Sequence, residues 1–340
     1  RGRLRPPAHM LGSFLKLKFL SLPEKLAVAR GLAAIRRERK SRADLDRISM
    51  LDWLHEKKQP PRAIDRFWRP ALVSAINEDL DRMAARHGFQ FFWLSLLARE
   101  DLHEMGLPAV PLRELYDAGQ WKSLGDVTLH TRCAVERIEV EGGRARGVIA
   151  GGQRHTAGAY ICAAPFERVA AMVPELGIPP TLFEHSPITG IHLWFDRPVT
   201  DLPHATLLDR TIQWMFNKRD GRYLQLVVSA SRGLLPAGRA EVVELAVREL
   251  SEFFPRAAEA VLERAQVVKE ARATFSAGPG TEALRPGAAT AIPNLFLAGD
   301  WTRTGWPATM EGAVRSGYLA AEAAACAAGH PARFLLPDPA

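Results

Sequence analysis

The sequence contains few cysteines and no long apolar run. Three cysteines occur among 340 residues, and their wide spacing argues against a disulfide framework and against a zinc site: Cys133, Cys162 and Cys326. We therefore expect a reducing, cytoplasmic environment and no bound metal. No stretch approaches the roughly 20 apolar residues that a transmembrane helix needs. With 47% hydrophobic and 24% charged residues, the composition is that of a globular protein.

A second absence concerns a glycine pattern. None of the 26 glycines forms a G-x-G-x-x-G loop near the start of the chain, where a strand and a helix would hold a dinucleotide diphosphate. The stretch from Gly142 to Gly147 contains three glycines, but it lies between two runs of alternating polarity. It therefore predicts a hairpin turn and not a phosphate loop.

The formal net charge of +7 is unevenly distributed. Basic residues alternate with apolar residues near the start of the chain: Lys16, Lys18, Lys25, Arg30, Arg36, Arg37, Arg39 and Lys40. Such a segment suits the surface of an anionic membrane and equally the solvated face of a helix, and both interpretations stay open. No nucleic-acid-binding motif accompanies these residues, so we expect no nucleic-acid partner.

The length of the chain exceeds one typical hydrophobic core, so we expect two domains. Helical periodicity is clearest in residues 23–40 and 81–101. Alternating polarity then predicts strands and one amphipathic helix, at residues 127–130, 134–140, 146–150, 189–195 and 223–230 and at residues 241–254 respectively. Glycine pairs at 142–143 and 151–152 mark the turns between the earlier strands.

The most informative pattern lies near the end of the chain. The apolar run Leu295–Ala298 predicts a buried strand, and Gly299 and Asp300 follow it directly. A carboxylate at the end of a strand can accept hydrogen bonds from the hydroxyls of a sugar alcohol. After a short loop, Thr309 and Met310 offer backbone N–H groups in the first turn of a helix. These donors suit the pyrimidine edge of a flavin, although a capped packing helix would show part of the same pattern.

Residues 298–317 resemble the C-terminal flavin motif of the FAD-dependent amine oxidase and phytoene desaturase superfamily. Asp300, where the amine oxidases have Glu, favours the isoprenoid desaturase side. Within that side, the stretch is most similar to the squalene-associated FAD-dependent desaturases, also described as hydroxysqualene dehydroxylases. The similarity continues in residues 22–27, 67–77 and 105–111.

The resemblance implies an α/β fold: an FAD/NAD(P)-binding Rossmann-like domain of the amine oxidase type, incomplete at its N-terminus and interleaved with an α+β substrate domain. It assigns residues 1–115 and 167–285 to the substrate domain, 116–166 and 286–330 to the FAD domain, and 331–340 to a tail. The residues it implies in FAD binding are Val135, Gly299, Asp300, Pro307, Ala308, Thr309 and Met310.

By the same resemblance, the substrate is a long apolar isoprenoid and the reaction is the reductive dehydroxylation of hydroxysqualene to squalene in hopanoid biosynthesis. Such an enzyme suits peripheral contact with the inner face of the cell membrane. Three alternatives stay open: a phytoene-type desaturase, an amine oxidase-like flavoenzyme, and a non-catalytic fragment or split subunit. Because the glycine loop is missing, we expect this chain to be a fragment that binds FAD weakly or not at all.

The sequence identifies no catalytic acid or base. Aromatic clusters are candidates for the wall of an apolar substrate tunnel, although each is more typical of ordinary core: Phe67–Trp68, Phe89–Trp93, Trp194–Phe195 and Trp214–Phe216. Asn77 and Glu78 follow an apolar helical run and are candidates for polar groups in the substrate cavity.

Overall fold

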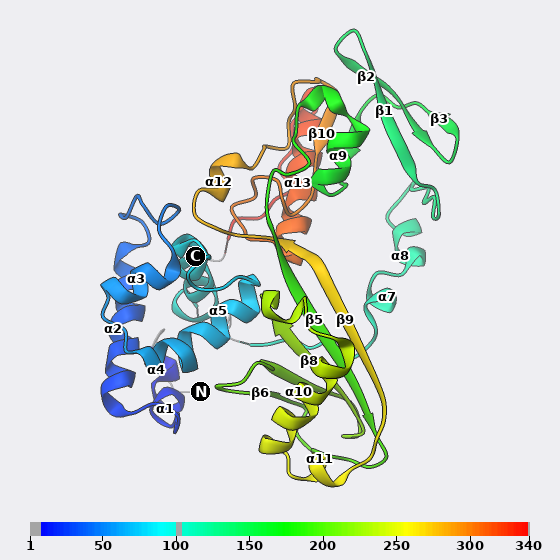
Figure 1. Ribbon diagram of the computed structural model, residues 1–340. Coiled ribbons are helices and arrows are strands. Elements are labelled where there is room, and N and C mark those ends of the chain that lie inside the picture. Colours follow the sequence, from blue (N-terminus) through cyan, green and yellow to red (C-terminus); the bar gives the residue numbers. More distant parts are fainter. Residues whose placement is uncertain (1–7, 100–103, 339–340) are drawn as a thin grey trace.

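The structure is a computed structural model that describes residues 8–99 and 104–338. The first part is helical (Figure 1) and consists of α1 (Leu11–Leu15), α2 (Leu22–Glu38), α3 (Met50–Glu56), α4 (Pro61–Ala63), α5 (Arg69–Ile76) and α6 (Ala85–Phe92). Two π-helical turns interrupt it, Ile64–Trp68 between α4 and α5 and Trp93–Leu97 after α6. The helix predicted over 23–40 is confirmed, whereas that over 81–101 begins only at Ala85.

Local sequence explains where these helices begin. Ser49 caps α3, because its hydroxyl accepts a hydrogen bond from the N–H of Asp52 at 3.0 Å, and the Asp52 carboxylate accepts the N–H of Ser49 at 3.3 Å. In the interior of the helical part, Trp53 and Trp68 are fully buried, with ring centroids 6.2 Å apart. Trp68, Phe89 and Phe92 of the aromatic clusters therefore belong to the core of this region, whereas Phe67 and Phe91 are half-buried.

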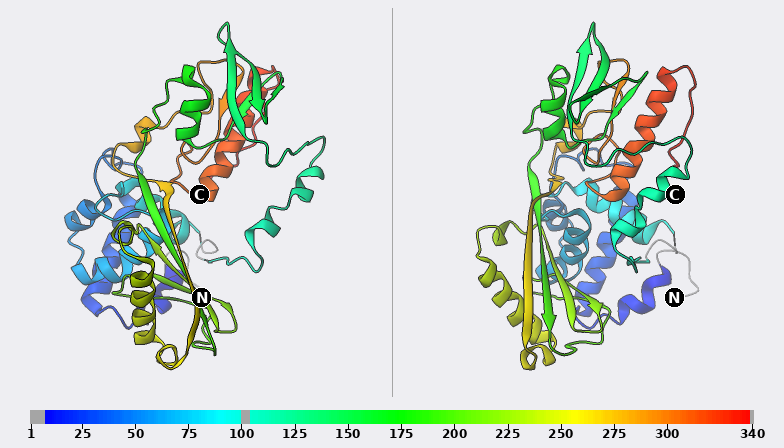
Figure 2. Two further views of the ribbon diagram at one scale, coloured as in Figure 1. Left: turned by 45° about the vertical axis from the view of Figure 1, so that its right-hand side comes forward. Right: turned by 90° about the vertical axis from the view of Figure 1, so that its right-hand side faces the viewer.

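A five-stranded sheet lies beside the helices, with strand order β6-β7-β8-β5-β9. All neighbouring strands in it are antiparallel: β5 (His185–Phe195), β6 (His204–Thr206), β7 (Trp214–Arg219), β8 (Tyr223–Ser229) and β9 (Leu262–Phe275). α10 (Arg239–Phe253) packs on one face, where Ile191 and Leu193 meet Val242 and Leu250 in one apolar cluster. The other face looks towards the helical part, as the right-hand view of Figure 2 shows.

Two residues join the helical part to this sheet. Asn77, in the left-handed conformation at the end of α5, donates through its side-chain amide to the carbonyl of Ser186 at 3.0 Å and accepts the N–H of Ala230 at 2.7 Å. The fully buried Glu78 accepts two hydrogen bonds from Arg232, at 2.6 and 2.8 Å. Both side chains thus fix the junction between the two parts.

The remaining strands form two small sheets. β1 (Val135–Glu141), β2 (Arg144–Ala150) and β3 (Gln153–His155) make an antiparallel meander whose turns fall at the predicted glycine pairs. β4 (Tyr160–Cys162) pairs in parallel with β10 (Leu295–Leu297), and α13 (Met310–Ala327) follows β10. The short helices α9 (Phe166–Met172), α11 (Arg256–Glu259) and α12 (Thr281–Leu284) complete the α/β arrangement.

The segment before the meander differs from the sequence prediction. Residues 127–130 form no strand, so that prediction is wrong. Two short helices, α7 (Leu112–Leu115) and α8 (Ala118–Lys122), precede them on the side of the molecule away from α1–α6 (Figures 1 and 2). The described side chains between residues 104 and 132 are exposed. No strand pairs with them among residues 8–99 and 104–338, so alternating polarity alone does not produce a strand.

None of the helices in residues 8–99 and 104–338 combines the length and apolar character needed to cross a bilayer.

Candidate functional site

The candidate site is built at the carboxyl end of β10, whose three residues are all buried. Gly299 follows with φ +130°, and a Cβ atom on it would lie 2.5 Å from the indole nitrogen of Trp301. Only glycine fits this position without strain. The N–H of Gly299 donates to the hydroxyl of Ser316 on α13 at 2.7 Å, and the Trp301 indole donates to the carbonyl of Ala164 at 3.0 Å. Hydrogen bonds therefore connect the segment after β10 to α13 and to the segment that follows β4.

Asp300 lines a cavity of about 440 Å³ together with Gly299, Trp301 and residues of β9 and the start of α9. Burial raises the pKa of its carboxyl group, and the positive charge of Arg285 works in the opposite direction. His185, at the start of β5, also lines the cavity and lies 2.7 Å from a carboxylate oxygen of Glu167. The cavity thus presents hydrogen-bond acceptors beside apolar walls.

Arg285 holds the loop that follows Asp300. Its side chain is only 1% exposed, and its guanidinium donates to the carbonyls of Trp306 at 2.6 Å and Asp300 at 2.8 Å. It also donates to the hydroxyl of Thr304 at 3.0 Å and pairs with Glu282 at 2.8 Å. One buried cation therefore fixes both ends of the loop, because the planar guanidinium presents several donors at once.

The loop leads into α13. Thr309 caps the helix, because its hydroxyl accepts the N–H of Gly312 at 3.0 Å. A Cβ atom on Gly312 would come within 2.7 Å of the carbonyl of Pro307, so glycine permits the close approach of helix and loop. The N–H groups of Met310 and Glu311, in the first turn, have no acceptor within the helix. These two donors and the positive end of the helix dipole are available to an electron-rich group.

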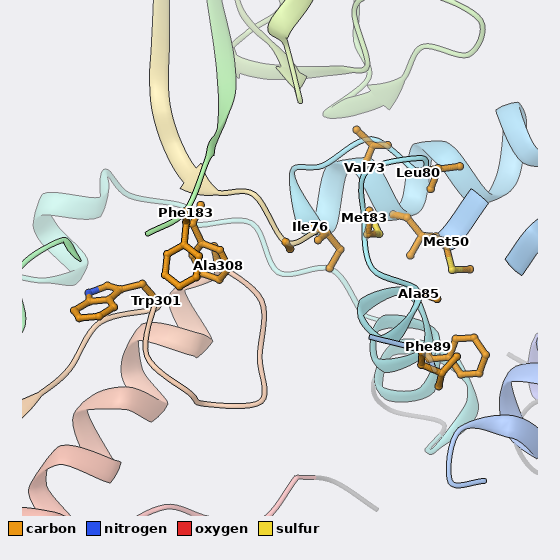
Figure 3. Close-up of a cluster of buried hydrophobic side chains, with 14 of the residues drawn as sticks. Met50, Val73, Ile76, Leu80, Met83, Ala85, Phe89, Phe183, Trp301 and Ala308 are labelled. Carbon is orange, nitrogen blue, oxygen red and sulfur yellow. The ribbon is translucent and has the colours of Figure 1, made fainter. Parts of the chain in front are cut away.

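A second cavity, of about 330 Å³, opens on the other side of the same loop. Its walls come from α5, α6 with the π-helical turn that follows, and the loop itself: Ala75, Ile76, His87, Gln90, Phe91, Leu94, Ser95, Trp306, Pro307 and Thr309. One apolar cluster continues across this region, from Met50 and Phe89 through Ile76 to Phe183, Ala308 and Trp301 (Figure 3). The cavity is therefore enclosed by well-packed elements.

The structure brings together six of the seven predicted site residues. Gly299, Asp300, Pro307, Ala308, Thr309 and Met310 lie at the end of β10 and along the loop into α13. The side chain of Met310 is 58% exposed, so its backbone N–H is the group that this site can use. Val135 lies apart, as the first residue of β1 in the meander and beside a β-bulge, and its contact with a cofactor stays a prediction.

Sequence reasoning missed three residues of the site. Arg285 precedes a proline in an irregular segment, and no periodic pattern marks it. His87 lies within a helical run without metal-ligand spacing, so nothing singled it out. Ser316 lies within the motif of residues 298–317, but the motif did not reveal that its hydroxyl holds Gly299.

The residues at this site fit FAD. Asp300 offers an acceptor for hydroxyl groups, and the first turn of α13 offers donors for the flavin pyrimidine, which gains negative charge on reduction. The lack of room for a side chain at Gly299 also suits a place where backbone and ligand come close. The fold and the site together define the class as an FAD-dependent oxidoreductase.

The family follows from the whole chain. Residues 1–325 match the family of flavin-containing amine oxidoreductases, and the chain belongs to this family. FAD is its cofactor.

Two groups of relatives are similar in sequence. The hydroxysqualene dehydroxylase of Sinorhizobium fredii is 40% identical over 166 residues, which are 49% of this chain and 38% of that protein. The 15-cis-phytoene desaturase of Solanum lycopersicum is 26% identical over 357 aligned positions, covering 93% of this chain and 59% of that protein. The chain thus spans less than two thirds of the length of either relative.

Solved structures show the same fold. An oxidoreductase from Methanosarcina mazei superposes with a TM-score of 0.67 at 19% identity, covering 90% of this chain and 73% of that one. A putrescine oxidase bound to putrescine superposes with a TM-score of 0.62 at 13% identity, covering 91% and 76%. The amine oxidase-type α/β fold expected from the sequence is therefore confirmed.

Proposed function

We propose that the intact enzyme carries out the reductive dehydroxylation of hydroxysqualene to squalene. The C–O bond of an allylic alcohol breaks, a C–H bond forms at the same carbon, and the oxygen leaves as water. When bound, reduced FAD would supply the hydride, and its second hydrogen would balance the water. The protein binds the isoprenoid, orients the reacting carbon and excludes water from it.

The observation that carries this proposal is the cavity beside residues 306–309. Apolar side chains of α5 and α6 form much of its wall, and the loop that borders it leads directly into the first turn of α13, where we propose that the flavin binds. An apolar chain can therefore lie against the flavin site. The two groups of sequence relatives support an isoprenoid substrate, because both are named for reactions of such molecules.

A third cavity, which is also apolar, supports a substrate too long for the cavity beside residues 306–309. It measures about 400 Å³ and lies between α1, α2 and the two π-helical turns, with walls from Phe14, Leu17, Leu32, Phe67, Leu96 and Leu97 among others. The π-helical turn Trp93–Leu97 borders both cavities, since Leu94 faces one and Leu96 the other. A π-helical turn re-aims side chains within a helix and is frequent at functional sites.

The same region supports peripheral contact with a membrane. Leu11, Leu15, Leu22 and Leu26 on α1 and α2 are each about half exposed, at 48%, 51%, 62% and 56%. The exposed Lys16 and Lys18 lie between them in sequence. Apolar side chains flanked by cations favour an anionic bilayer surface. We expect binding to anionic vesicles that weakens when Leu11 and Leu15 are both replaced by Ser, measured by flotation.

We propose the assignment of segments to a substrate domain and an FAD domain that the resemblance implied. Residues 1–115 and 167–285 bind the substrate, whereas residues 116–166 and 286–330 contribute to the FAD domain, with Val135 near the adenine end. The contacts of Asn77 and Glu78 with the five-stranded sheet support the first grouping, because they unite the helical part and that sheet. The parallel pairing of β4 with β10 supports the second.

The desaturation of a carotenoid precursor is the competing reaction. It uses the same flavin site in the oxidative direction, and the phytoene desaturase of Solanum lycopersicum matches more of the chain than the dehydroxylase of Sinorhizobium fredii does.

Mass spectrometry of two incubations separates the two reactions. Pre-reduced protein with FAD is given hydroxysqualene, and oxidised protein with FAD is given phytoene. We expect squalene from the first and no new double bonds in the second. Asp300→Asn, which keeps the shape of the side chain but loses its charge, serves as the FAD-binding control. Desaturated phytoene without any squalene would replace the proposal with its competitor.

A further inference from the structure

The cavity beside residues 306–309 contains a buried polar side chain that the fold itself does not use. His87 on α6 is 2% exposed, and its Nδ1 has no hydrogen-bond partner among the described residues. His87 is one of the residues that line the cavity. A buried polar atom without a partner costs free energy, so folds rarely keep one without a reason.

The other hydroxyl groups of this wall are already engaged. The hydroxyl of Ser95 donates to the carbonyl of Phe91 at 2.7 Å. The hydroxyl of Thr309 accepts from Gly312 and donates to the carbonyl of Pro307 at 3.2 Å. Apart from the half-buried amide of Gln90, His87 is therefore the polar group on this wall that remains available to a ligand.

The position of His87 is rigid. Three backbone hydrogen bonds tie the start of α6 to other segments: Ala84 donates to Ala277 at 2.9 Å, Ala85 to Ile48 at 3.0 Å and Arg86 to Leu45 at 2.9 Å. The imidazole is thus presented to the cavity by an element that cannot easily rotate away. Its neighbours on the same helix face, one and two turns on, are Gln90, Phe91 and Leu94.

We propose that His87 binds the hydroxyl group of an isoprenoid alcohol in this cavity and so positions the carbon that carries it. The apolar wall accepts the hydrocarbon chain, and the imidazole supplies the hydrogen bond that separates an alcohol from a hydrocarbon. The proposal rests on the proposed function only for the identity of the alcohol.

The protonation state fits this role. Burial lowers the pKa of His87 to about 3, and the positive charges of Arg86 and Arg285 add to the effect. The ring is neutral at physiological pH, with one nitrogen that donates and one that accepts. It therefore binds the hydroxyl and does not act as the proton source.

The test compares an alcohol with its hydrocarbon. Binding of farnesol and of farnesene is measured in the presence of FAD by tryptophan fluorescence, because Trp306 lines the cavity, and Trp306→Phe verifies the origin of the signal. We expect the unaltered protein to bind farnesol about tenfold more tightly, the value of one hydrogen bond. His87→Phe abolishes the preference, and His87→Gln retains part of it.

A matched control uses another unpartnered histidine. His204 on β6 also has an Nδ1 without a hydrogen-bond partner among the described residues, but it does not line this cavity. His204→Phe leaves the preference for farnesol unchanged. His87→Phe also unfolds at the same temperature as the unaltered protein or at a higher one, because an apolar ring replaces an unsatisfied polar group.

The outcomes separate this inference from the proposed function. A His87-dependent preference for farnesol without conversion of hydroxysqualene keeps the alcohol site and removes the proposed reaction. Conversion of hydroxysqualene with an equal preference in His87→Phe overturns the role of His87 and keeps the reaction. Equal binding of farnesol and farnesene by the unaltered protein also overturns it.

Discussion

The five-stranded sheet and the two-stranded parallel sheet hold their residues in different ways. β5 pairs along its length with β8 on one side and β9 on the other, and α10 covers the apolar face of the sheet. β10 pairs with β4 over three residues, yet it carries Gly299 and Asp300. The larger sheet is positioned by its own ladder, whereas the smaller sheet depends on side chains. Precision at a site therefore does not require an extensive sheet around it.

The largest expected effect follows from removing the side chain of Arg285, whose hydrogen bonds hold the loop after β10. Arg285→Met takes away the donors to Trp306, Asp300 and Thr304 and leaves Glu282 without this partner. We expect a loss of about 3–5 kcal/mol in the free energy of unfolding, measured by urea denaturation, and a loss of FAD retention. Arg272→Met is the control, because this side chain lines the cavity that contains Asp300 but is 72% exposed. An equal loss in both variants would contradict the role of Arg285.

A cavity in the larger sheet tests the opposite side of the comparison. Leu193 on β5 is fully buried against α10. Leu193→Ala should lower the free energy of unfolding by about 3 kcal/mol, because it deletes buried methyl groups and leaves a void. In the intact enzyme, the folded fraction should nevertheless bind FAD as tightly as before, measured by flavin fluorescence in a titration. Weakened FAD binding in a still-folded variant would show that the two sheets are coupled.

A smaller effect is expected from one methyl group at the end of β10. Gly299→Ala introduces a Cβ atom in contact with the Trp301 indole at a φ that other residues rarely adopt. We expect a cost of about 1–3 kcal/mol, together with weaker FAD binding. Gly317→Ala on the exposed face of α13 meets nothing within 4 Å and should be neutral or stabilising by up to about 1 kcal/mol. The comparison fails if both alanines behave alike.

The smallest effect concerns pH. The folded state holds the pKa of His87 near 3, below the unfolded value of 6.5, so only the unfolded state gains a proton between these values. The contribution of His87 to the free energy of unfolding is therefore fully present above pH 6.5. It falls as the pH decreases, by at most about 1.4 kcal/mol for each pH unit. In urea titrations at pH 7.0 and 5.5, His87→Phe should lose less stability than the unaltered protein. An identical loss would refute the assignment.

Much of the site was predictable from the sequence because its pattern is local. Leu295–Ala298 is an apolar run, Gly299 and Asp300 follow it directly, and Thr309 and Met310 mark the start of the next helix. The structure confirms the strand and the start of the helix. Arg285 and His87 were not predictable, since their importance comes from burial and from partners distant in sequence. A single arginine or histidine carries no periodic signal.

Two other expectations show the limits of pattern and composition. Residues 127–130 alternate like a strand but have no neighbour with which to pair. Asn77 and Glu78 are polar residues after an apolar helix, and they were candidates for the substrate cavity. Their partners lie more than 100 residues later, Ser186 in β5 and Arg232 just after β8, so only the fold reveals that they join two parts of the molecule.

The pairing of β4 with β10 has a consequence for the order in which the chain folds. The indole of Trp301 reaches a carbonyl 137 residues earlier in the chain. At synthesis rates of about 5–20 residues per second, β4 leaves the ribosome roughly 10–30 seconds before its partner. The helical part can fold during that interval, because its contacts are local. Among the described residues β4 pairs only with β10, so this edge of β4 stays open until β10 emerges, and this interval is when a chaperone would have most to protect.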